Sequence, residues 1–289
     1  MGKIKDFIIR IIREVGREYT RIDRTCNACG RECFGGTGTG ENLFCKDCYE
    51  HLPLNKGDIC SRCGRSSVEP VVACESCSGE ELPFDLARSS FYYAPPIDGM
   101  IRNLKYDNRR YLARVLSPFM AETAMINFSD ADVMTFIPMP DKAKKRRGYN
   151  QAELLAESVS EITGVAVVNA LVKDVDTDRQ ARLNRSERKM NLKGAIKVRN
   201  KALVAGKRVI VVDDVMTTGA TAETAAAALK KAGADKVYVL TAASVTDART
   251  ARLLGQERSV SAVRREKRNA RLIKKLERQR KRAERTKGV

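Results

Sequence analysis

Two adjacent carboxylates followed by several hydroxyls are the residues of this sequence best suited to chemistry. They lie in the stretch VIVVDDVMTTGAT, residues 209–221, which contains Asp213 and Asp214. The four residues before the aspartates are apolar and β-branched, which is typical of a buried strand. Carboxylates at the end of such a strand cost free energy unless something binds them. The hydroxyls and the flexible backbone that follow come from Thr217, Thr218, Gly219 and Thr221.

The surrounding segment predicts a strand, a helix and a second strand. Residues 209–212 form the first strand, residues 222–232 a helix that ends at Gly233, and residues 236–243 the next strand. A unit of this kind connects parallel strands in a sheet whose two faces are covered. Ligands of such sheets bind beyond the carboxyl ends of the strands. We therefore expect the aspartates and threonines to border a ligand crevice.

The chemistry of this stretch suits a phosphorylated sugar. The backbone N–H groups of residues 217–221 begin a helix, where unsatisfied donors and partial positive charge attract an anion. Two carboxylates would repel phosphate, but they accept hydrogen bonds from vicinal hydroxyls, with a divalent cation as a further partner. Together they predict a ribose 5-phosphate ligand. Helix capping is the simpler alternative, but it needs only one Asp or Thr.

Eight of the nine cysteines form Cys-x-x-Cys pairs. The pairs are Cys26/Cys29, Cys45/Cys48, Cys60/Cys63 and Cys74/Cys77. Two intervening residues let both thiolates bind one tetrahedral zinc ion, so four pairs predict two structural sites of four thiolates. A disulfide framework would require a secreted protein. A thioredoxin-type motif would explain only one pair.

The spacing leaves the pairing of these motifs open. Sequential pairing gives two compact knuckles, and the alternative joins the first pair to the third. Cys33 is left without a metal role. The run GGTGTG at residues 35–40 follows no strand and opens no helix, so we interpret it as a knuckle loop and not as a nucleotide loop. Sites filled by four cysteines have no open position for catalysis.

Composition and charge limit the class of protein further. The chain has 289 residues, 43% of them hydrophobic, and a formal charge of +18. Residues 256–289 contain fourteen Lys and Arg against four Glu, and residues 1–25 contain seven against four acidic residues, so the middle of the chain is nearly neutral. No signal peptide or apolar run of membrane length is evident, which predicts a cytoplasmic protein. A serine-hydrolase triad is disfavoured because His51 is the only histidine.

The remaining elements must hold the site in place. The expected elements are a strand, a turn at Pro95–Pro96 and helical structure within residues 84–128, a strand at 133–137 that ends in Ile-Pro-Met-Pro, a helix at 148–164 and a strand at 165–168. The inward residues of the helix would be Leu154, Leu155, Val159 and Ile162. The polar segment 173–195 is too long for a simple connection, which indicates a functional loop.

Several blocks of the sequence resemble a known family. VIVVDDVMTTGAT is similar to the motif of type I phosphoribosyltransferases that binds 5-phosphoribosyl 1-pyrophosphate (PRPP). The other blocks resemble the ComF family of competence-associated phosphoribosyltransferase-like proteins. They are the cysteine pairs, LKY at 104–106, IPMP at 137–140, RRGYNQAELLA at 146–156 and RQARLNRSERKMNLKGAI at 179–196. Tyr149 and Ile196 stand where the family often has Phe. The resemblance covers about residues 26–245.

This resemblance implies a fold, a ligand and a set of site residues. The fold would be α/β, a type I phosphoribosyltransferase-like parallel sheet with an N-terminal cysteine-rich zinc-ribbon module. Asp213 and Asp214 would bind the ribose hydroxyls of PRPP. Its 5-phosphate would be bound by Met216, Thr217, Thr218, Gly219, Ala220 and Thr221. Its pyrophosphate would be contacted by Pro138, Met139 and Pro140, with Mg²⁺ bridging pyrophosphate and ribose.

Two basic segments, residues 142–151 and 179–189, could reach the same crevice. A pyrophosphate leaving group concentrates negative charge, which arginines and lysines stabilise. We expect Arg146, Arg147, Arg179 and Arg188 to take part. The alternative is that they form a solvated surface.

Two functions of different kinds are compatible with these residues. One is a PRPP-dependent phosphoribosyltransferase with an unknown acceptor, connected with DNA uptake, competence or DNA handling. The other is a non-catalytic accessory protein that binds single-stranded DNA and uses PRPP as a cofactor or regulatory ligand. A competence helicase or other DNA-processing proteins would be its partners.

The ends of the chain differ from its middle. Residues 1–25 predict a basic amphipathic helix that packs on protein or, as an alternative, rests on an anionic membrane. Residues 246–289 form a basic tail suited to nucleic acid or the ribosome surface, with a solubility tail as the alternative. Between them we place a zinc-binding module at 26–82 and a phosphoribosyltransferase-like domain at 83–245.

Overall fold

The structure is a computed structural model, and it describes most of the chain between the two basic ends. The described residues are 25–32, 43–67, 69–75, 77–79, 81–173 and 195–246. All of them belong to one compact unit, Met1–Thr246. The two tails, Cys33, the GGTGTG run, Arg179 and Arg188 lie outside the described residues.

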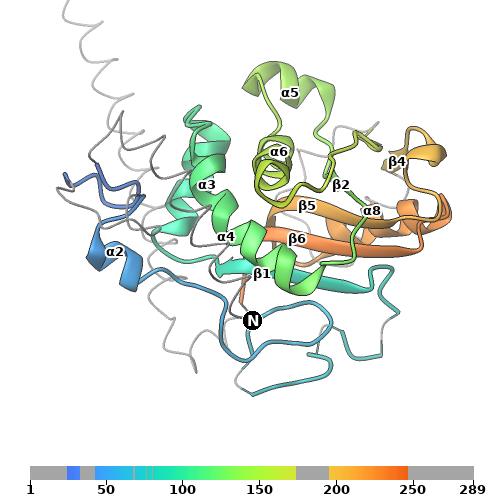
Figure 1. Ribbon diagram of the computed structural model, residues 1–289, viewed down its shortest axis with the longest axis horizontal. Coiled ribbons are helices and arrows are strands. Elements are labelled where there is room, and N and C mark those ends of the chain that lie inside the picture. The colour runs from blue at the N-terminus through green and yellow to red at the C-terminus, as the bar shows by residue number, and fades with distance from the viewer. Residues whose placement is uncertain are drawn as a thin grey trace, which may run out of the picture. The chain divides into compact units, whose positions relative to one another are not determined.

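A parallel sheet of four strands in the order β1-β6-β5-β2 forms the centre of this unit (Figure 1). The strands are β1 (Leu86–Tyr92), β2 (Val133–Phe136), β5 (Arg208–Met216) and β6 (Lys236–Ser244). All three strand pairs are parallel, and the register places Val212 beside Phe136 on one side and Leu240 on the other. The central strands are continuous apolar runs because both faces of the sheet are covered.

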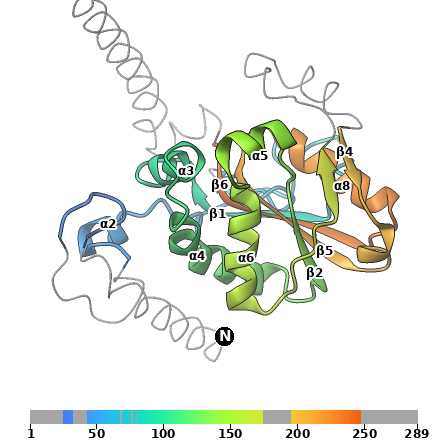
Figure 2. The same cartoon turned by 90° about the horizontal axis from the view of Figure 1, so that it is seen from above.

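Helices cover the sheet on its two faces. The helices are α2 (Lys46–Glu50), α3 (Ile97–Tyr106), α4 (Leu112–Asn127), α5 (Asp141–Arg147), α6 (Gln151–Thr163) and α8 (Ala220–Lys231). Helices α4 and α6 pack against each other and against the sheet (Figure 2). Helix α8 connects β5 to β6 and packs on the opposite face, as right-handed crossovers require.

Most of the predicted elements are present, but several of their limits differ. Strand β5 continues to Met216, so both aspartates lie within it and not beyond its end. Residues 165–168 form no strand, although Val167 makes a single parallel bridge to Met134. The short antiparallel strands β3 (Leu171–Lys173) and β4 (Ile196–Val198), together with α5, were not expected.

The buried face of α6 also differs in part from the prediction. Leu155 and Val159 are buried as expected, but Leu154 and Ile162 are only partly buried. Ala152, Ala156 and Ser158 complete the buried face. The small residues let α6 approach α4 closely.

The cysteine-rich segment packs directly on the sheet. Leu54 forms an antiparallel bridge with Phe91 of β1, and the backbone N–H of Ala87 donates to the Arg62 carbonyl at 2.9 Å. The Phe119 ring on α4 lies 5.0 Å from the Phe91 ring and 6.3 Å from the Phe44 ring. The parallel sheet and the cysteine-rich segment therefore share one hydrophobic core. Among the described residues, no helix combines the length and apolar character that a membrane span needs.

Candidate functional site

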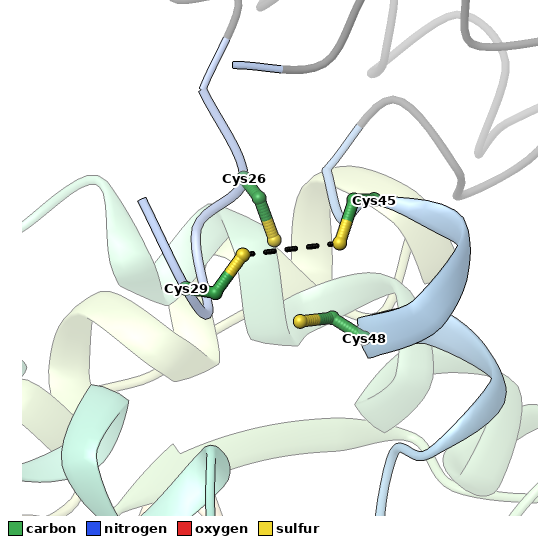
Figure 3. Close-up of side chains that lie close together, drawn as sticks. All are labelled: Cys26, Cys29, Cys45 and Cys48. Carbon is green, nitrogen blue, oxygen red and sulfur yellow. Dashed lines mark hydrogen bonds between the residues drawn. The ribbon is translucent and has the colours of Figure 1, made fainter. Parts of the chain in front are cut away.

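The eight cysteines gather into two groups of four in chain order. Cys26, Cys29, Cys45 and Cys48 form the first group (Figure 3), and Cys60, Cys63, Cys74 and Cys77 form the second. The sulfurs of each group lie within 4.8 Å of one another. The pairing is therefore sequential, and the interleaved alternative is wrong.

The distances between the sulfurs fit a zinc ion. Four sulfurs about 2.3 Å from a tetrahedral metal lie roughly 3.8 Å apart. The Cys29 and Cys45 sulfurs are 3.8 Å apart, and the Cys63 and Cys74 sulfurs are 3.7 Å apart. Both groups thus suit structural zinc, which would hold each knuckle together.

Each knuckle also supplies donors that favour a thiolate. The backbone N–H and the guanidinium of Arg31 lower the pKa of Cys29 to about 6. Burial raises the pKa of Cys60, but backbone hydrogen bonds, first from Cys63 and then from Cys74, lower it to about 7. Burial raises the pKa of Cys48, Cys63 and Cys77. Ionised thiols are the form that binds metal, so the hydrogen bonds to Cys29 and Cys60 favour metal binding at those two sulfurs.

The two aspartates of β5 point to opposite faces of the sheet, as successive residues of a strand do. Asp213 borders a hollow beneath the start of α8, together with Thr241 of the neighbouring strand β6. Asp214 is buried and lies on the face covered by α3 and α4. The two carboxylates therefore leave the strand on different sides, but they remain close enough that the charge of Asp214 raises the pKa of Asp213.

Asp214 forms an ion pair with a lysine. The Nζ atom of Lys105, at the end of α3, lies 2.8 Å from Oδ1 of Asp214. Burial lowers the pKa of Lys105, but Asp214 and then Asp213 raise it above the ordinary value. The other carboxylate oxygen of Asp214, Oδ2, is buried and has no hydrogen-bond partner among the described residues. One acceptor at the site is thus available to a ligand.

Asp213 has an unusual protonation equilibrium. Burial and then the charge of Asp214 raise its pKa to about 7, against the opposing effect of Lys105. Its Oδ1 atom accepts a hydrogen bond of 2.8 Å from the backbone N–H of Asp214. A perturbed carboxylate in a hollow is typical of a functional site.

Residues 216–221, named the phosphate loop here, connect β5 to α8. Gly219 is the N-cap of α8 and has a φ of +89°, a backbone conformation that favours glycine. The hollow beside the loop is open to solvent. It is lined by Asp213, Val215, Met216, Thr217, Gly219, Ala220, Thr221, Ala222 and Thr241. Most of the predicted phosphate-binding residues thus lie around one hollow at a helix N-terminus.

The Ile-Pro-Met-Pro segment follows β2 beside the aspartates. The backbone N–H of Ile137 donates to the Val212 carbonyl at 2.9 Å, which places residues 138–140 next to Asp213 and Asp214. Asn150 fixes the far end of the segment, because its amide donates to the Ile137 carbonyl at 2.9 Å and its Oδ1 atom caps α6. The carboxyl ends of β2 and β5 therefore lie beside each other.

The described arginines of the basic segment belong to α5. Arg146 is exposed, and Arg147 lies with its guanidinium 5.3 Å from the centre of the Tyr106 ring. Arg147 also donates to Gln151 on α6. Its predicted role with pyrophosphate stays a prediction, as do those of Arg179 and Arg188.

Two contacts of this site were not predicted from the sequence. Lys105 lies in the LKY block, which served only as a family marker, and nothing in its spacing indicates a carboxylate partner. Arg65 lies among the cysteines, yet its guanidinium donates to the Thr217 carbonyl in the phosphate loop. Both contacts join segments that are far apart in the sequence. Periodicity and local motifs describe neighbouring residues, so they could not predict these contacts.

Comparison with known proteins agrees with this architecture. Residues 138–269 match a family model described as "Phosphoribosyl transferase domain". The match begins at the segment after β2 and continues past β6 into the basic tail, which we had placed outside the resemblance. A solved purine phosphoribosyltransferase from Pyrococcus horikoshii Ot3 aligns with 20% identity and a TM-score of 0.30, over 46% of this chain and 74% of that chain.

Curated relatives are similar over most of their length. "Competence protein F" of Haemophilus influenzae is 27% identical over 72% of this chain and 93% of its own. "DNA utilization protein YhgH" of Escherichia coli K12 is 28% identical over 68% and 88%. "Competence protein ComFC" of Bacillus subtilis is 25% identical over 67% and 80%.

The matched domain and the parallel sheet around the Asp-Asp strand define a protein of the type I phosphoribosyltransferase fold. Its N-terminal segment contributes two four-cysteine groups that suit zinc. The similarity to the competence proteins narrows the class. These similarities support a ComF family protein with a phosphoribosyltransferase-like domain.

Proposed function

We propose that this protein binds PRPP with Mg²⁺ at the carboxyl ends of β2 and β5. The observation that supports it most is the unpartnered, buried Oδ2 atom of Asp214, a few residues before the helix N-terminus that begins α8. An unpartnered acceptor can bind a hydroxyl donor or a cation, and a helix N-terminus can bind an anion. PRPP brings vicinal hydroxyls, a 5-phosphate and, with Mg²⁺, a cation.

Each part of the ligand has residues suited to it. Asp213 and Asp214 bind the ribose hydroxyls, the phosphate loop binds the 5-phosphate, and residues 138–140 lie beside the pyrophosphate. Mg²⁺ would neutralise the pyrophosphate oxygens, and the carboxylate oxygens are the ligand type that it prefers. In the absence of ligand, Lys105 supplies the positive charge that Asp214 requires.

A calorimetric titration of the zinc-loaded protein with PRPP and Mg²⁺ tests the proposal. Saturable binding by the wild type that is lost in Asp213→Asn/Asp214→Asn would support it. The matched control is Glu161→Gln, which removes an exposed carboxylate on α6. No binding by folded wild type, or equal binding by the aspartate variant, would refute it.

Transfer of the phosphoribosyl group to an acceptor is the enzymatic form of this proposal. The bond between C1 of ribose and pyrophosphate breaks as the acceptor's nucleophilic atom bonds to C1, and pyrophosphate leaves. Pyrophosphate release in an acceptor screen distinguishes a transferase from a protein that uses PRPP as a regulatory ligand. The acceptor is not indicated by the residues of the site. A cytoplasmic location also stays a proposal.

Single-stranded DNA binding is the second candidate, and one surface favours it. The basic aromatic surface consists of Tyr106, Arg109, Arg110 and Tyr111 between α3 and α4, with Lys142, Lys145, Arg146 and Arg147 on α5. Tyr106 is 71% exposed and Tyr111 is 43% exposed, which is unusual for large rings. Exposed rings among cations suit stacked bases and a phosphate backbone.

The contacts across this surface hold its two segments together. The Arg110 guanidinium lies 4.6 Å from the centre of the Tyr149 ring, and the Tyr149 hydroxyl donates to the Leu104 carbonyl. Arg147 lies over the Tyr106 ring. The names of the competence and DNA utilization relatives agree with a nucleic-acid partner. Competence helicases and other DNA-processing proteins are the partners that we propose for such a role.

Binding of a fluorescent oligo(dT) strand tests this second candidate. Tyr106→Ala/Tyr111→Ala should lower affinity by roughly tenfold, from the loss of base stacking. Ile126→Ala removes an exposed apolar side chain elsewhere and should leave affinity unchanged. Affinity should fall steeply with salt. If deletion of residues 256–289 abolishes binding while the tyrosine variant binds normally, the tail and not this surface is the site.

A further inference from the structure

The two cysteine groups contain a repeated knuckle. Each begins with Cys-x-x-Cys-Gly-Arg, as CNACGR at residues 26–31 and as CSRCGR at residues 60–65. In the first, the Cys26 N–H donates to the Arg31 carbonyl at 2.8 Å, and in the second the Cys60 N–H donates to the Arg65 carbonyl at 2.8 Å. The two arginines therefore occupy equivalent places in two copies of one backbone structure.

The side chains of these arginines have different partners. Arg31 faces solvent, with its side chain 67% exposed, and its guanidinium lies 3.5 Å from Asp47. Arg65 instead donates to the Thr217 carbonyl, in the phosphate loop 152 residues further along the chain. The arginine of the first knuckle thus forms a surface ion pair, and the arginine of the second knuckle contacts the candidate ligand site.

The second knuckle is held firmly against the sheet. Gly64 has a φ of +67°, and a Cβ atom there would lie 2.5 Å from the Ala87 carbonyl oxygen of β1. The Asn55 amide donates to the carbonyls of Gly64 and Ser89 at 2.8 and 3.1 Å. Arg65 therefore extends toward the phosphate loop from a base that cannot shift without moving β1.

Further contacts join the same knuckle to the loop. Ser66 lies within hydrogen-bond distance of Thr246 at 3.2 Å, just after β6. A small hollow lies between the knuckle and the loop. It is lined by Cys63, Arg65, Cys77, Leu82, Phe84, Met216, Thr218, Gly219 and Glu223. Two zinc-binding cysteines and the phosphate loop therefore border the same space.

We infer that Arg65 is a positioning residue that makes the second cysteine group part of the phosphate site, an inference that rests on the proposed PRPP binding. In a trans peptide the C=O and N–H bonds point in opposite directions. A guanidinium on the Thr217 carbonyl therefore fixes the direction of the Thr218 N–H, one of the donors that a phosphate needs. A metal ion bound by the cysteines of this knuckle would then also help to hold the loop in its binding conformation, through Arg65.

Two measurements on three full-length, zinc-loaded variants test this inference. The variants are Arg65→Gln, Arg65→Lys, which keeps a single charged donor, and the matched control Arg31→Gln in the first knuckle. Hydrogen exchange of the backbone amides of residues 216–221 reports the loop without ligand. Calorimetry with PRPP and Mg²⁺ reports binding, and a chelating dye counts the zinc ions.

We expect Arg65→Gln to keep both zinc ions, to exchange the loop amides faster and to bind PRPP about tenfold more weakly, the loss typical of a hydrogen bond from a charged donor. Arg65→Lys should recover part of the affinity. Arg31→Gln should match wild type in loop exchange and PRPP affinity, although it removes a donor to the Cys29 thiolate. Wild-type exchange and affinity in Arg65→Gln, or equal losses in Arg31→Gln, would overturn the inference. If wild type itself does not bind PRPP, the proposed function fails, and the exchange rates alone decide the role of Arg65.

Discussion

Lys105 and Asp214 form a buried ion pair in which only one carboxylate oxygen is used. The Nζ to Oδ1 distance is 2.8 Å, and the Asp214 side chain is 4% exposed. A buried charge that loses its partner is destabilising, because neither water nor another group replaces the lost interaction. The pair therefore stabilises the unliganded site, and the second oxygen stays buried without a hydrogen-bond partner among the described residues.

Replacing Lys105 should reveal this dependence. We expect Lys105→Met to lower the free energy of unfolding by about 2 kcal/mol, less than for a fully buried pair because the lysine is partly exposed. Lys105→Met/Asp214→Asn should recover most of that loss, since no charge remains to be compensated. Urea unfolding of the two single variants and the double variant measures the coupling. Additive losses would show that the two side chains do not interact.

The protonation of Asp213 should make stability depend on pH. Burial and then Asp214 raise its pKa to about 7, from an ordinary value near 3.8. Between about pH 4 and pH 7 the folded protein thus holds a proton that the unfolded chain has released, so the contribution of this group to stability falls as pH rises through that range. Asp213→Asn should remove this pH dependence. The free energy of unfolding of the variant, taken relative to wild type, should therefore be higher at pH 8 than at pH 5 by on the order of 2 kcal/mol.

Urea unfolding of wild type and Asp213→Asn at both pH values measures that difference. Asp235→Asn is a suitable control, because it removes a carboxylate at the opposite end of the sheet, before β6. If the free energies of unfolding of wild type and Asp213→Asn changed in parallel with pH, Asp213 would have a pKa near its ordinary value.

The sequence predicted the parts of the site that depend on local pattern. The apolar run before Asp213, the helix after Gly219 and the four cysteine pairs each have a periodicity or spacing with one physical meaning. The end of β5 was placed too early because carboxylates are rare in buried strands. Here the strand continues through both, since Asp214 is neutralised by Lys105 of α3, a contact with no local sequence signal.

Gly219 should matter for ligand binding beyond its effect on stability. Its φ of +89° is strained for any residue with a Cβ atom, although the nearest atom to such a Cβ is Glu223 Oε1 at 3.6 Å. Gly219→Ala should cost about 1 kcal/mol of stability and also move the first N–H groups of α8. We expect PRPP affinity to fall at least tenfold, measured by calorimetry.

A second glycine provides the control for that variant. Gly206 has a φ of +70° with open space around it, and it lies between β4 and β5, at the opposite end of β5 from the phosphate loop. Gly206→Ala should cost a similar amount of stability and leave PRPP affinity unchanged. Equal affinities for the two variants would show that the conformation of Gly219 is not needed for binding.

The two zinc groups should differ in what their loss does to the ligand site. Cys48→Ser and Cys74→Ser each remove one half-buried ligand, from the first and the second group respectively. Each variant should lose one of two zinc ions per chain, as counted by dye release with a thiol-modifying reagent, and should melt at a lower temperature because metal binding stabilises the folded knuckle. Of the two variants, Cys74→Ser should also weaken PRPP binding, because within the described residues its knuckle is the one that contacts the phosphate loop, through Arg65. Equal loss of PRPP affinity in both variants would mean that zinc acts through overall stability. If either variant retained two zinc ions, the mutated sulfur would not be a ligand.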